Sequence, residues 1–383
     1  MDEKSLKPQL RFKGFSDAWE QRKLDNCTDE IVAGGDVDKE KLLSSGTYPV
    51  IANALTNDGI VGFYNNSYRI KAPAVTVTGR GDVGHAKARS VNFTPVVRLL
   101  TVISRHDPVF LENAINTLNI VIESTGVPQL TVPQLGKHEI KFPENISEQS
   151  KIGTFFSNLD NLITLHQRKL DKLGNMKKAL LEKMFPKNDS NVPEIRFKGF
   201  SDAWEQRKLG DFGSVCMNKR IFKNQTSEKG EIPFYKIGTF GGQPDAFISR
   251  SLFEEYKLKY PYPICGDILI SASGSIGRTV EYQGEEAYFQ DSNIVWLNHR
   301  NSIYNPFLRY FYTVVKWSGI EGSTIKRLYN ENILNTQITI PQKIEQQKIG
   351  TFFSNLDNLI TLHQRKLEKL KNIKKSCLEK MFV

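Results

Sequence analysis

Two carboxylates and a lysine in the second half of the sequence have a spacing that could support hydrolysis of a phosphodiester. Asp245 and Glu255 could bind Mg²⁺, and Lys257 could stabilise the charge that develops on the phosphate. Such a site needs the two acids on adjacent strands, whereas the segment SLFEEYKLKY around Glu255 is typical of a helix or a loop. The three residues also occur in one half of the chain only.

A second motif points to a nucleotide cofactor and does not have the sequence context that such a site needs. Residues 79–84 spell G-x-G-x-x-G directly after a predicted strand. A dinucleotide site also needs a helix after the glycines and an acid about 20 residues further on. The segment HAKARSVNF follows instead, and residues 99–102, which include no acid, occupy the place of the acid. We therefore expect this chain to bind no cofactor and no metal.

Basic and hydroxyl side chains gather around a Gly-rich turn in each half of the sequence. The turns are GDVG at 81–84 and GSIG at 274–277. Glycine lets the backbone approach a phosphate closely, and Arg, Ser or Thr side chains can reach phosphates or base edges. With two further clusters in which basic residues alternate with aromatic ones, the candidate DNA-binding residues are Arg80, His85, Lys87, Arg89, Lys219, Arg220, Lys223, Ser273, Ser275, Arg278, Lys326 and Arg327. Solvated hairpins without function remain the alternative for the turns.

The segments that must position these residues are duplicated. RFKGFSDAWEQRKL occupies residues 11–24 and again 196–209, and KIGTFFSNLDNLITLHQRKL occupies 151–170 and again 348–367. The inserts between them, about residues 25–142 and 210–340, share almost no letters. Two identical frames that hold different inserts suit a protein that must recognise two different things. The first motif could pack beside the tails or dock identical partners, and both interpretations stay open.

Each duplicated tail has the apolar repeat of a long helix that pairs with another helix. Steps of four and three place apolar residues on a narrow seam. The predicted pairing residues are Ile152, Phe156, Leu159, Ile163, Leu170, Leu173, Ile349, Phe353, Leu356, Ile360, Leu367 and Leu370. Related faces favour antiparallel pairing of the two tails as a coiled coil, and packing of each tail on its own domain is the alternative. His166, His363, Lys177 and Lys374 on the seam are interpreted as register devices or snorkelling side chains rather than as ligands.

The inserts show strands and one helix in the same order. The first predicts strands at 48–53, 74–78, 96–104 and 139–142 and a helix at 109–122. The second predicts strands at 232–237, 268–272, 293–297 and 337–340 and a helix at 306–316. This order predicts two α+β domains. The chain then divides into 1–142 and 188–340, each a motif copy with its insert, and the helices 143–187 and 341–383.

Composition agrees with a nucleic-acid partner inside the cell. The net charge is +10, and residues 147–187 and 345–383 each contain eight Lys/Arg against four acids. The four cysteines are scattered, which fits a reducing cytoplasm. A leader peptide or a membrane span is not expected, because no basic start precedes an apolar run of the necessary length.

This layout resembles the specificity subunit of type I restriction–modification enzymes. The resemblance rests on the Trp19 and Trp204 motifs, the G-x-[V/I]-G turns, the Phe142-Pro143 and Ile340-Pro341 exits, and the Glu148-Gln149 and Glu345-Gln346 starts of the tails. It covers nearly the whole chain. It implies that each insert is a target-recognition domain for one half of a split site in double-stranded DNA, and that the helices set the spacing and dock two methyltransferase subunits.

The resemblance also implies that catalysis belongs to other chains. S-adenosylmethionine, ATP and Mg²⁺ are then expected on the methyltransferase and motor-nuclease (restriction) subunits, and this chain is expected to be non-catalytic. Two alternatives from other classes remain: a stand-alone PD…ExK-like nuclease that uses Asp245, Glu255 and Lys257, and a scaffold that binds only proteins.

Overall fold

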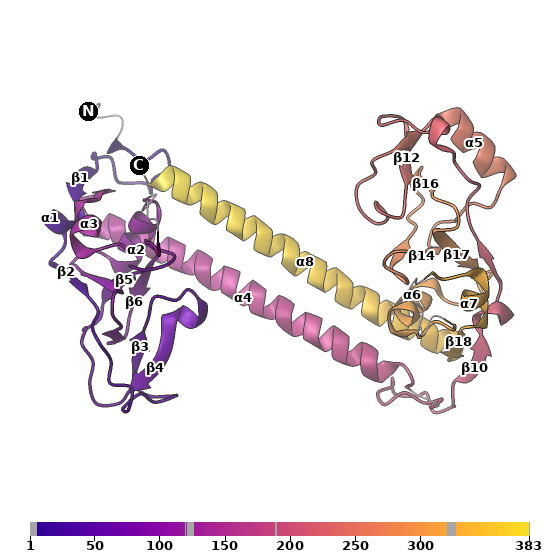
Figure 1. The fold of residues 1–383 in the computed structure, drawn as a ribbon, viewed down its shortest axis with the longest axis horizontal. Coiled ribbons are helices and arrows are strands. Elements are labelled where there is room, and N and C mark those ends of the chain that lie inside the picture. Colours follow the sequence, from indigo (N-terminus) through magenta and orange to yellow (C-terminus); the bar gives the residue numbers. More distant parts are fainter. Residues whose placement is uncertain (1–5, 119, 121–125, 188–189, 320–326, 383) are drawn as a thin grey trace. The chain divides into compact units, whose positions relative to one another are not determined.

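The computed structural model describes residues 6–118, 120, 126–187, 190–319 and 327–382. The chain forms two compact units, the first from Met1–Arg168 with Gln364–Val383 and the second from Lys169–His363. Each unit contains one insert and parts of two long helices, α4 (Ile146–Met184) and α8 (Lys343–Met381). Both helices have 39 residues, close to the predicted length. Figure 1 follows the chain from indigo to yellow.

The insert of the first unit is built from short strands and helices. Before α4 its elements are β1 (Glu20–Lys23), α1 (Leu24–Cys27), β2 (Glu30–Ala33), β3 (Tyr48–Ile51), η2 (Thr56–Gly59), β4 (Ile60–Tyr64), β5 (Ala74–Val77), β6 (Ala86–Arg89), β7 (Thr94–Pro95), β8 (Leu100–Ile103), α2 (Pro108–Asn116), α3 (Val132–Lys137) and β9 (Glu139–Phe142). They form sheets in the orders β2-β8-β5-β6, β4-β3-β7 and β1-β9. Asp107 caps α2 by accepting hydrogen bonds from the Val109 and Phe110 amides, as an N-cap carboxylate should.

The second unit repeats this topology with different residues. Its elements are β10 (Glu205–Lys208), η3 (Leu209–Asp211), β11 (Ser214–Cys216), η4 (Lys223–Gln225), β12 (Ile232–Tyr235), β13 (Phe247–Ile248), α5 (Arg250–Lys259), β14 (Ile268–Ser271), β15 (Thr279–Glu281), β16 (Tyr288–Phe289), β17 (Ile294–Asn298), α6 (Asn305–Val314), α7 (Asn330–Asn335) and β18 (Gln337–Ile340). The sheets are β11-β17-β14-β15, β13-β12-β16 and β10-β18. The register is kept as well, since Glu20 pairs with Phe142 and Glu205 with Ile340.

The predicted elements agree with the structure in type and order, with one local error. The strand predicted at 96–104 is β8, which begins only at Leu100. Residues 96–99 form a turn, closed by a hydrogen bond of 3.0 Å from the Leu99 amide to the Val96 carbonyl. The structure describes α2 only to Asn116, and residues 119, 121 and 122 of the predicted helix lie outside the described residues.

The first duplicated motif and the residue before it contact both the start of one long helix and the end of the other. Arg11 forms a bidentate ion pair with the buried carboxylate of Glu148 in α4, at 2.6 and 2.8 Å. The Leu10 amide caps the Lys380 carbonyl near the end of α8 at 2.9 Å. The second copy makes the same contacts, from Arg196 to Glu345 and from the Ile195 amide to the Lys183 carbonyl. Packing beside the tails is therefore a structural role of this motif.

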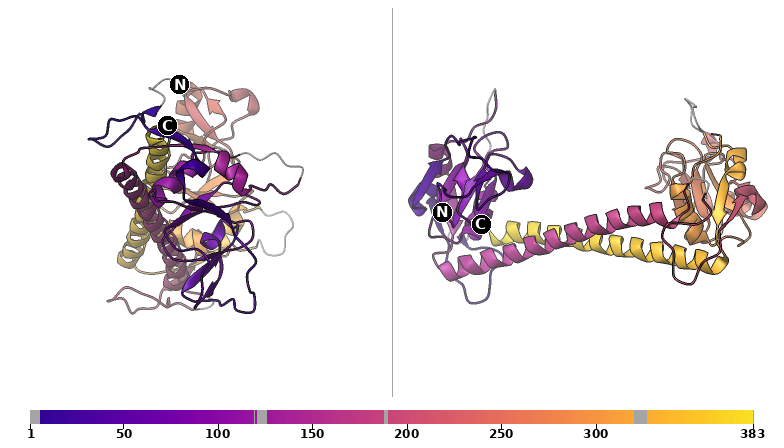
Figure 2. Two further views of the ribbon diagram at one scale, coloured as in Figure 1. Left: turned by 90° about the vertical axis from the view of Figure 1, so that its left-hand side faces the viewer. Right: turned by 90° about the horizontal axis from the view of Figure 1, so that it is seen from below.

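The two long helices pair antiparallel inside each unit, which confirms the predicted coiled coil (Figures 1 and 2). Ile152, Phe156 and Leu159 of α4 share a core with Leu370, Cys377 and Met381 of α8 in the first unit. Ile349, Phe353, Leu356 and Ile360 of α8 share a core with Leu173, Leu180 and Met184 of α4 in the second. Of the other predicted pairing residues, Leu367 is buried and Ile163 and Leu170 are half-buried.

The seam lysines form ion pairs between the two long helices, which favours the register role among the two that the sequence leaves open. Lys374 pairs with Asp160 at 2.5 Å in the first unit, and Lys177 pairs with Asp357 at 2.5 Å in the second. These are the same ion pair in both copies, because Lys177 and Lys374 occupy one position of the duplicated tail and the two aspartates another. A slip of one residue would break both pairs and leave charged groups at the seam.

A Met-Phe sequence at the end of each long helix completes the core of the unit in which that helix ends. Phe382 lies 6.1 Å from Trp19 and 5.3 Å from Phe110 between ring centroids. In the second unit, Phe185 contacts Trp204 at 6.2 Å and Phe307 at 5.4 Å. Trp19 and Trp204 are 1% and 2% exposed, so the shared Trp motif forms the aromatic centre of each unit.

Candidate nucleic-acid interface

In each unit, the candidate DNA-binding loops lie together where neighbouring strands of the four-stranded sheet end. In the first unit, Ala33 at the end of β2 pairs with Leu100 at the start of β8, and Leu100 pairs with Val77 at the end of β5. The β5–β6 hairpin turn, residues 78–85, and the 96–99 turn therefore leave the sheet on the same side. We call this end of the strands, with the loops that leave it, the loop edge of the first unit. The loop edge of the second unit holds residues 217–220, the hairpin turn 272–278 and residues 290–293.

The two Gly-rich turns are built in the same way although their sequences differ. In the first, the Thr78 hydroxyl donates to the Asp82 carbonyl and accepts from the His85 amide at 3.0 Å. In the second, the Ser271 hydroxyl donates to the Ser275 carbonyl and accepts from the Arg278 amide at 2.9 Å. The first and last glycines of each turn have positive φ, between 65° and 86°, which side chains disfavour. Each insert thus presents a rigid loop of one shape with different exposed side chains.

The structure separates the four predicted residues of the first hairpin. Arg80 and His85 are exposed on the turn itself. Lys87 is exposed on β6, two residues from the turn. Arg89 pairs with Ala74 at the opposite end of the strand, and its guanidinium donates to the Thr76 hydroxyl at 3.0 Å.

Arg89 also has the surroundings of a structural residue. Burial lowers the pKa of the Arg89 guanidinium, while Asp58 and Glu112 favour its charged form. Its side chain lines a cavity of about 330 Å³ together with His85 and Lys87. Arg89 thus pairs at the far end of β6 while its side chain shares this cavity with two other predicted residues, and its contact with DNA stays a prediction.

In the second unit, three predicted residues converge on one turn, residues 291–293 before β17. Arg220 forms an ion pair with Asp291 at 2.9 Å. Arg327 donates to the Ser292 carbonyl at 3.3 Å, and the Ser273 hydroxyl donates to the Asn293 side chain at 2.8 Å. Residues far apart in the sequence are thereby brought to one place on the loop edge.

The remaining predicted residues of the second unit lie on or near the same edge. Ser275 and Arg278 are exposed on the hairpin turn, and Arg278 reaches the Gly241 carbonyl at 3.4 Å. Lys219 lies 5.0 Å from the centroid of the Tyr260 ring, and Lys223 is exposed at the start of η4. Lys326 lies outside the described residues.

The sequence analysis did not identify Arg98 or Asn53, and it could not show that two aromatic residues among the basic clusters are exposed. Arg98 occupies the 96–99 turn, and Asn53 ties that turn to the hairpin by bonds to the Val97 carbonyl and the Gly79 amide, at 3.1 and 2.7 Å. Phe222 and Tyr329 are 58% and 64% exposed beside the basic residues of the second unit. The aromatic letters were visible in the sequence, whereas Arg98 was hidden inside an apparent strand.

The proposed metal-binding trio is not assembled in this fold. Glu255 and Lys257 lie on the helix α5, where Glu255 pairs with Lys259 at 3.0 Å. Asp245 precedes this helix and pairs with Lys236 at 2.9 Å. The ammonium of Lys257 lies 5.2 and 5.0 Å from the ring centroids of Phe253 and Tyr262. These side chains have structural partners, and the acids are not on adjacent strands.

No group of three or more His, Cys, Asp or Glu side chains in the described residues is arranged to hold a metal ion. In the same part of the chain, no helix combines the length and apolar character needed to cross a membrane.

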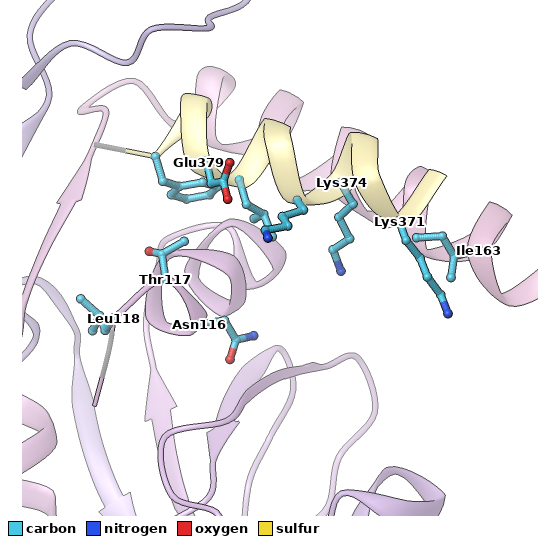
Figure 3. Close-up of a pocket in the computed structure, with 10 residues that line it drawn as sticks. Asn116, Thr117, Leu118, Ile163, Lys371, Lys374 and Glu379 are labelled. Atoms are coloured by element: carbon cyan, nitrogen blue, oxygen red, sulfur yellow. The ribbon is translucent and has the colours of Figure 1, made fainter. Parts of the chain in front are cut away.

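A groove in the first unit carries three lysines and differs between the copies (Figure 3). It has a volume of about 610 Å³ and lies between the end of α2 and the last turns of α8. Its apolar wall includes Ile163 and Phe382, and its lysines are Lys371, Lys374 and Lys375. Lys371 corresponds to Gly174 in the first tail. A partner that binds both copies alike would therefore not depend on this groove.

Comparison with known proteins places the whole layout in one family. A model of the type I restriction modification DNA specificity domain matches residues 17–175 and again 201–372. A type I restriction enzyme specificity subunit of Haemophilus influenzae is 57% identical over 158 residues, which are 40% of this chain and 41% of that protein. The chain thus spans less than half the length of that relative. A type I specificity subunit of Mycoplasma genitalium is 20% identical over 98% of this chain and 97% of its own length.

Solved structures show the same fold. The type I restriction–modification S subunit from M. genitalium superposes with a TM-score of 0.63 at 18% identity, covering 98% of this chain and 99% of that one. A chain from a study of complex assembly and conformational transition in a type I system gives a TM-score of 0.51 at 16% identity, covering 94% and 97%. The repeated match of the family model over most of the sequence confirms the resemblance, and the chain belongs to the type I restriction–modification DNA specificity family.

Proposed function

We propose that this chain recognises a two-part site in double-stranded DNA, with one part read by the loop edge of each unit. The observation that carries the proposal is the combination of an identical frame with different loops. Both inserts have the same sheet orders and the same hairpin geometry, and they differ in the side chains that the loop edge presents. A shared scaffold with unlike loop residues gives two specificities from one fold.

Charge at the loop edges supports a nucleic-acid partner. Exposed cations there include Arg80 in the first unit and Arg220 and Arg278 in the second. Arg327 stacks on Tyr329 with 5.8 Å between the guanidinium carbon and the ring centroid, and this ring is 64% exposed. Such side chains bind phosphates and base edges in duplex DNA.

Replacing Arg80 or Arg278 by alanine is expected to weaken recognition of one half-site each. The full chain, assembled with its methyltransferase subunits, would be used to select DNA from a pool of randomised duplexes. A lost base contact should reduce affinity for the preferred half-site by roughly 1–3 kcal/mol and relax the preference there. Each variant is the control for the other, because the untouched half-site should be selected as by the wild type.

Two outcomes of this selection would contradict the proposal. A wild-type complex that selects no sequence would favour a scaffold that binds only proteins. Variants that select the same sequences as the wild type, with the same affinity, would leave both Gly-rich turns as solvated hairpins.

We further propose that the chain works in the cytoplasm as the non-catalytic subunit of a larger complex. Two methyltransferase subunits would bind it and supply S-adenosylmethionine-dependent chemistry, and motor-nuclease subunits would supply cleavage with ATP and Mg²⁺. Duplicated surface residues support two identical partners. Leu162 and Leu165 of α4 are 44% and 62% exposed, and Leu359 and Leu362 of α8 are 47% and 46% exposed.

These leucine pairs are the proposed core of the methyltransferase docking surface. Each pair is spaced by three residues and so lies on one face of its helix. Single exposed leucines are common, but the same apolar pair exposed twice within an identical segment is what two identical partners would need. Exposed residues of the first motif, such as Lys13 and its copy Lys198, are also identical although their exposure leaves them free to differ.

Changing Leu162 and Leu165 together to glutamate is expected to remove one of two bound methyltransferase subunits. Charge on the face would have to be desolvated in the interface, which is strongly unfavourable. Native mass spectrometry of the complex would show the loss of one subunit, and the same change at Leu359 and Leu362 should remove the other. Thr164→Glu is the matched control, since Thr164 is exposed between the leucines. Full occupancy in the combined four-leucine variant would disprove this docking surface.

A further inference from the structure

Arg98 has a backbone conformation that arginine seldom adopts. It is the third residue of the 96–99 turn and has φ +70°. Turns with a positive φ at the third position normally carry Gly or Asn there. A residue with a Cβ loses roughly 1–2 kcal/mol in this region, so the surrounding structure must hold the turn in place.

Four contacts hold the 96–99 turn at the loop edge of the first unit. The Val96 amide donates to the Ile51 carbonyl at 2.8 Å, and the Gly34 amide donates to the Leu99 carbonyl at 2.7 Å. Asn53 donates to the Val97 carbonyl at 3.1 Å. The backbone of Gly79 lies so close that a Cβ there would come within 2.1 Å of the Arg98 carbonyl oxygen. The base of the hairpin that carries Arg80 is therefore in contact with Arg98.

The side chain of Arg98 has no polar partner among the residues that the structure describes. It is half-buried, and its guanidinium makes no hydrogen bond or ion pair with any residue that the structure describes. By comparison, Arg69 and Arg105 in the same insert bond the Asp36 carbonyl and the Asp29 carboxylate. Local structure thus explains the positions of those two guanidinium groups and does not explain that of Arg98.

We propose that Arg98 recognises a guanine in the half-site bound by the first unit. This inference rests on the proposed function and names one base contact within it. Guanine presents two acceptors, O6 and N7, in the major groove, and the planar guanidinium can donate to both. A phosphate contact needs only a positive charge, which a lysine in relaxed backbone would supply. A strained, tightly held backbone suits a contact that depends on the orientation of a planar group.

The corresponding turn of the second unit supports this assignment. Ser292 has φ +59° and lies two residues before the start of β17, as Arg98 lies two residues before the start of β8. The Ser292 carbonyl accepts from the guanidinium of Arg327 at 3.3 Å. Two inserts with almost no common letters thus both place a residue with positive φ two positions before the corresponding strand, and each has an arginine at that place.

Arg98→Gly tests the assignment without disturbing the fold, because glycine adopts positive φ at no steric cost. The wild-type and variant chains, each assembled with methyltransferase subunits, would select from the same pool of randomised duplexes. We expect the variant to lose the preference for guanine at one position of the first half-site and to bind the wild-type site at least about tenfold more weakly. The second half-site should be unchanged, and the melting temperature should not fall.

Two further variants separate base recognition from charge. Arg98→Lys should behave like Arg98→Gly, because the ammonium cannot bond both guanine acceptors in one plane. Arg105→Ala is the matched control, since Arg105 is exposed at the other end of β8 and should select like the wild type. An Arg98→Gly variant that selects the wild-type sequence overturns the assignment. So does an equal loss of affinity for all sequences that Arg98→Lys restores, which would indicate a phosphate contact. If the wild type selects no sequence, the proposed function itself fails.

Discussion

Replacing both Leu356 and Ile360 by aspartate is expected to unfold the second unit and leave the first unit folded. Leu356 is 5% exposed and packs in the core around Trp204 and Phe307, with Ile360 against the same cluster. Loss of two such side chains costs about 2–5 kcal/mol each even for alanine, and burying a carboxylate adds to it. The total reaches the whole stability of a typical domain, about 5–15 kcal/mol.

Calorimetry can distinguish local from global unfolding in this variant. The wild type should show transitions for two units, and the variant should lose the one that belongs to the second. Leu159→Asp with Ile163→Asp is the mirror control, because these positions of the first tail correspond to Leu356 and Ile360. That control should remove the other transition. Unchanged helix content and unchanged melting in both variants would contradict helix pairing through this seam.

The second large effect is expected from exchanging whole inserts within the chain. With residues 25–142 replaced by residues 210–340, both units should recognise the half-site that the second unit recognises in the wild type. The boundaries of the inserts are compatible with the exchange, because the strand pairs β1–β9 and β10–β18 have the same register. The incoming insert brings Phe307 in place of Phe110, so the Trp19 and Phe382 rings keep an aromatic partner. The Tyr304 amide donates to the Gln346 side chain at 2.9 Å in its own frame, and in the first frame it would meet Gln149, which accepts from the Asp107 amide.

Selection from randomised duplexes would show the result directly. Half-sites read by separate units with no shared partners should act independently, so the first half of the wild-type site should vanish and the second should appear twice. The reciprocal exchange, with residues 25–142 in both frames, is the control and should duplicate the first half instead. Binding of the methyltransferase should persist in both. An exchange that scrambles both halves, or that abolishes methyltransferase binding, would show that recognition is not modular.

The long helices and the order of elements could be predicted because their signals are strong and extended. A heptad seam over ten positions is hard to imitate by chance, and it gave the antiparallel pair correctly. The strands β1 and β10 were not predicted, since their sequence EQRK is polar and they pair only with one neighbour each. Phe185 and Phe382, which follow the last seam positions of the tails, were not predicted as core residues, although the repeated letters EKMF were a usable signal.

The candidate site shows why local sequence is insufficient. The Gly-rich turns were found because glycines at fixed offsets mark positive φ. Arg98 was missed because Val-Val-Arg-Leu-Leu is typical of a strand, and only tertiary contacts impose its φ of +70°. Arg220, Ser273 and Arg327 were identified singly, but their convergence on residues 291–293 depends on strand order. The backbone of Arg89 lies at the far end of β6 from the turn, whereas its side chain lines one cavity with His85 and Lys87, and the sequence alone could not show either fact.

The membership of Phe382 in the core of the first unit has a consequence for synthesis on the ribosome. The second unit is continuous in the chain, from Lys169 to His363. The first unit is completed by residues that follow the whole of the second unit, although most of its sequence is made first. At about 5–20 residues per second this delay is roughly 10–40 s, during which the aromatic centre around Trp19 and Phe110 lacks its final ring. The aromatic core of the first unit is therefore complete only after the whole second unit has been synthesised.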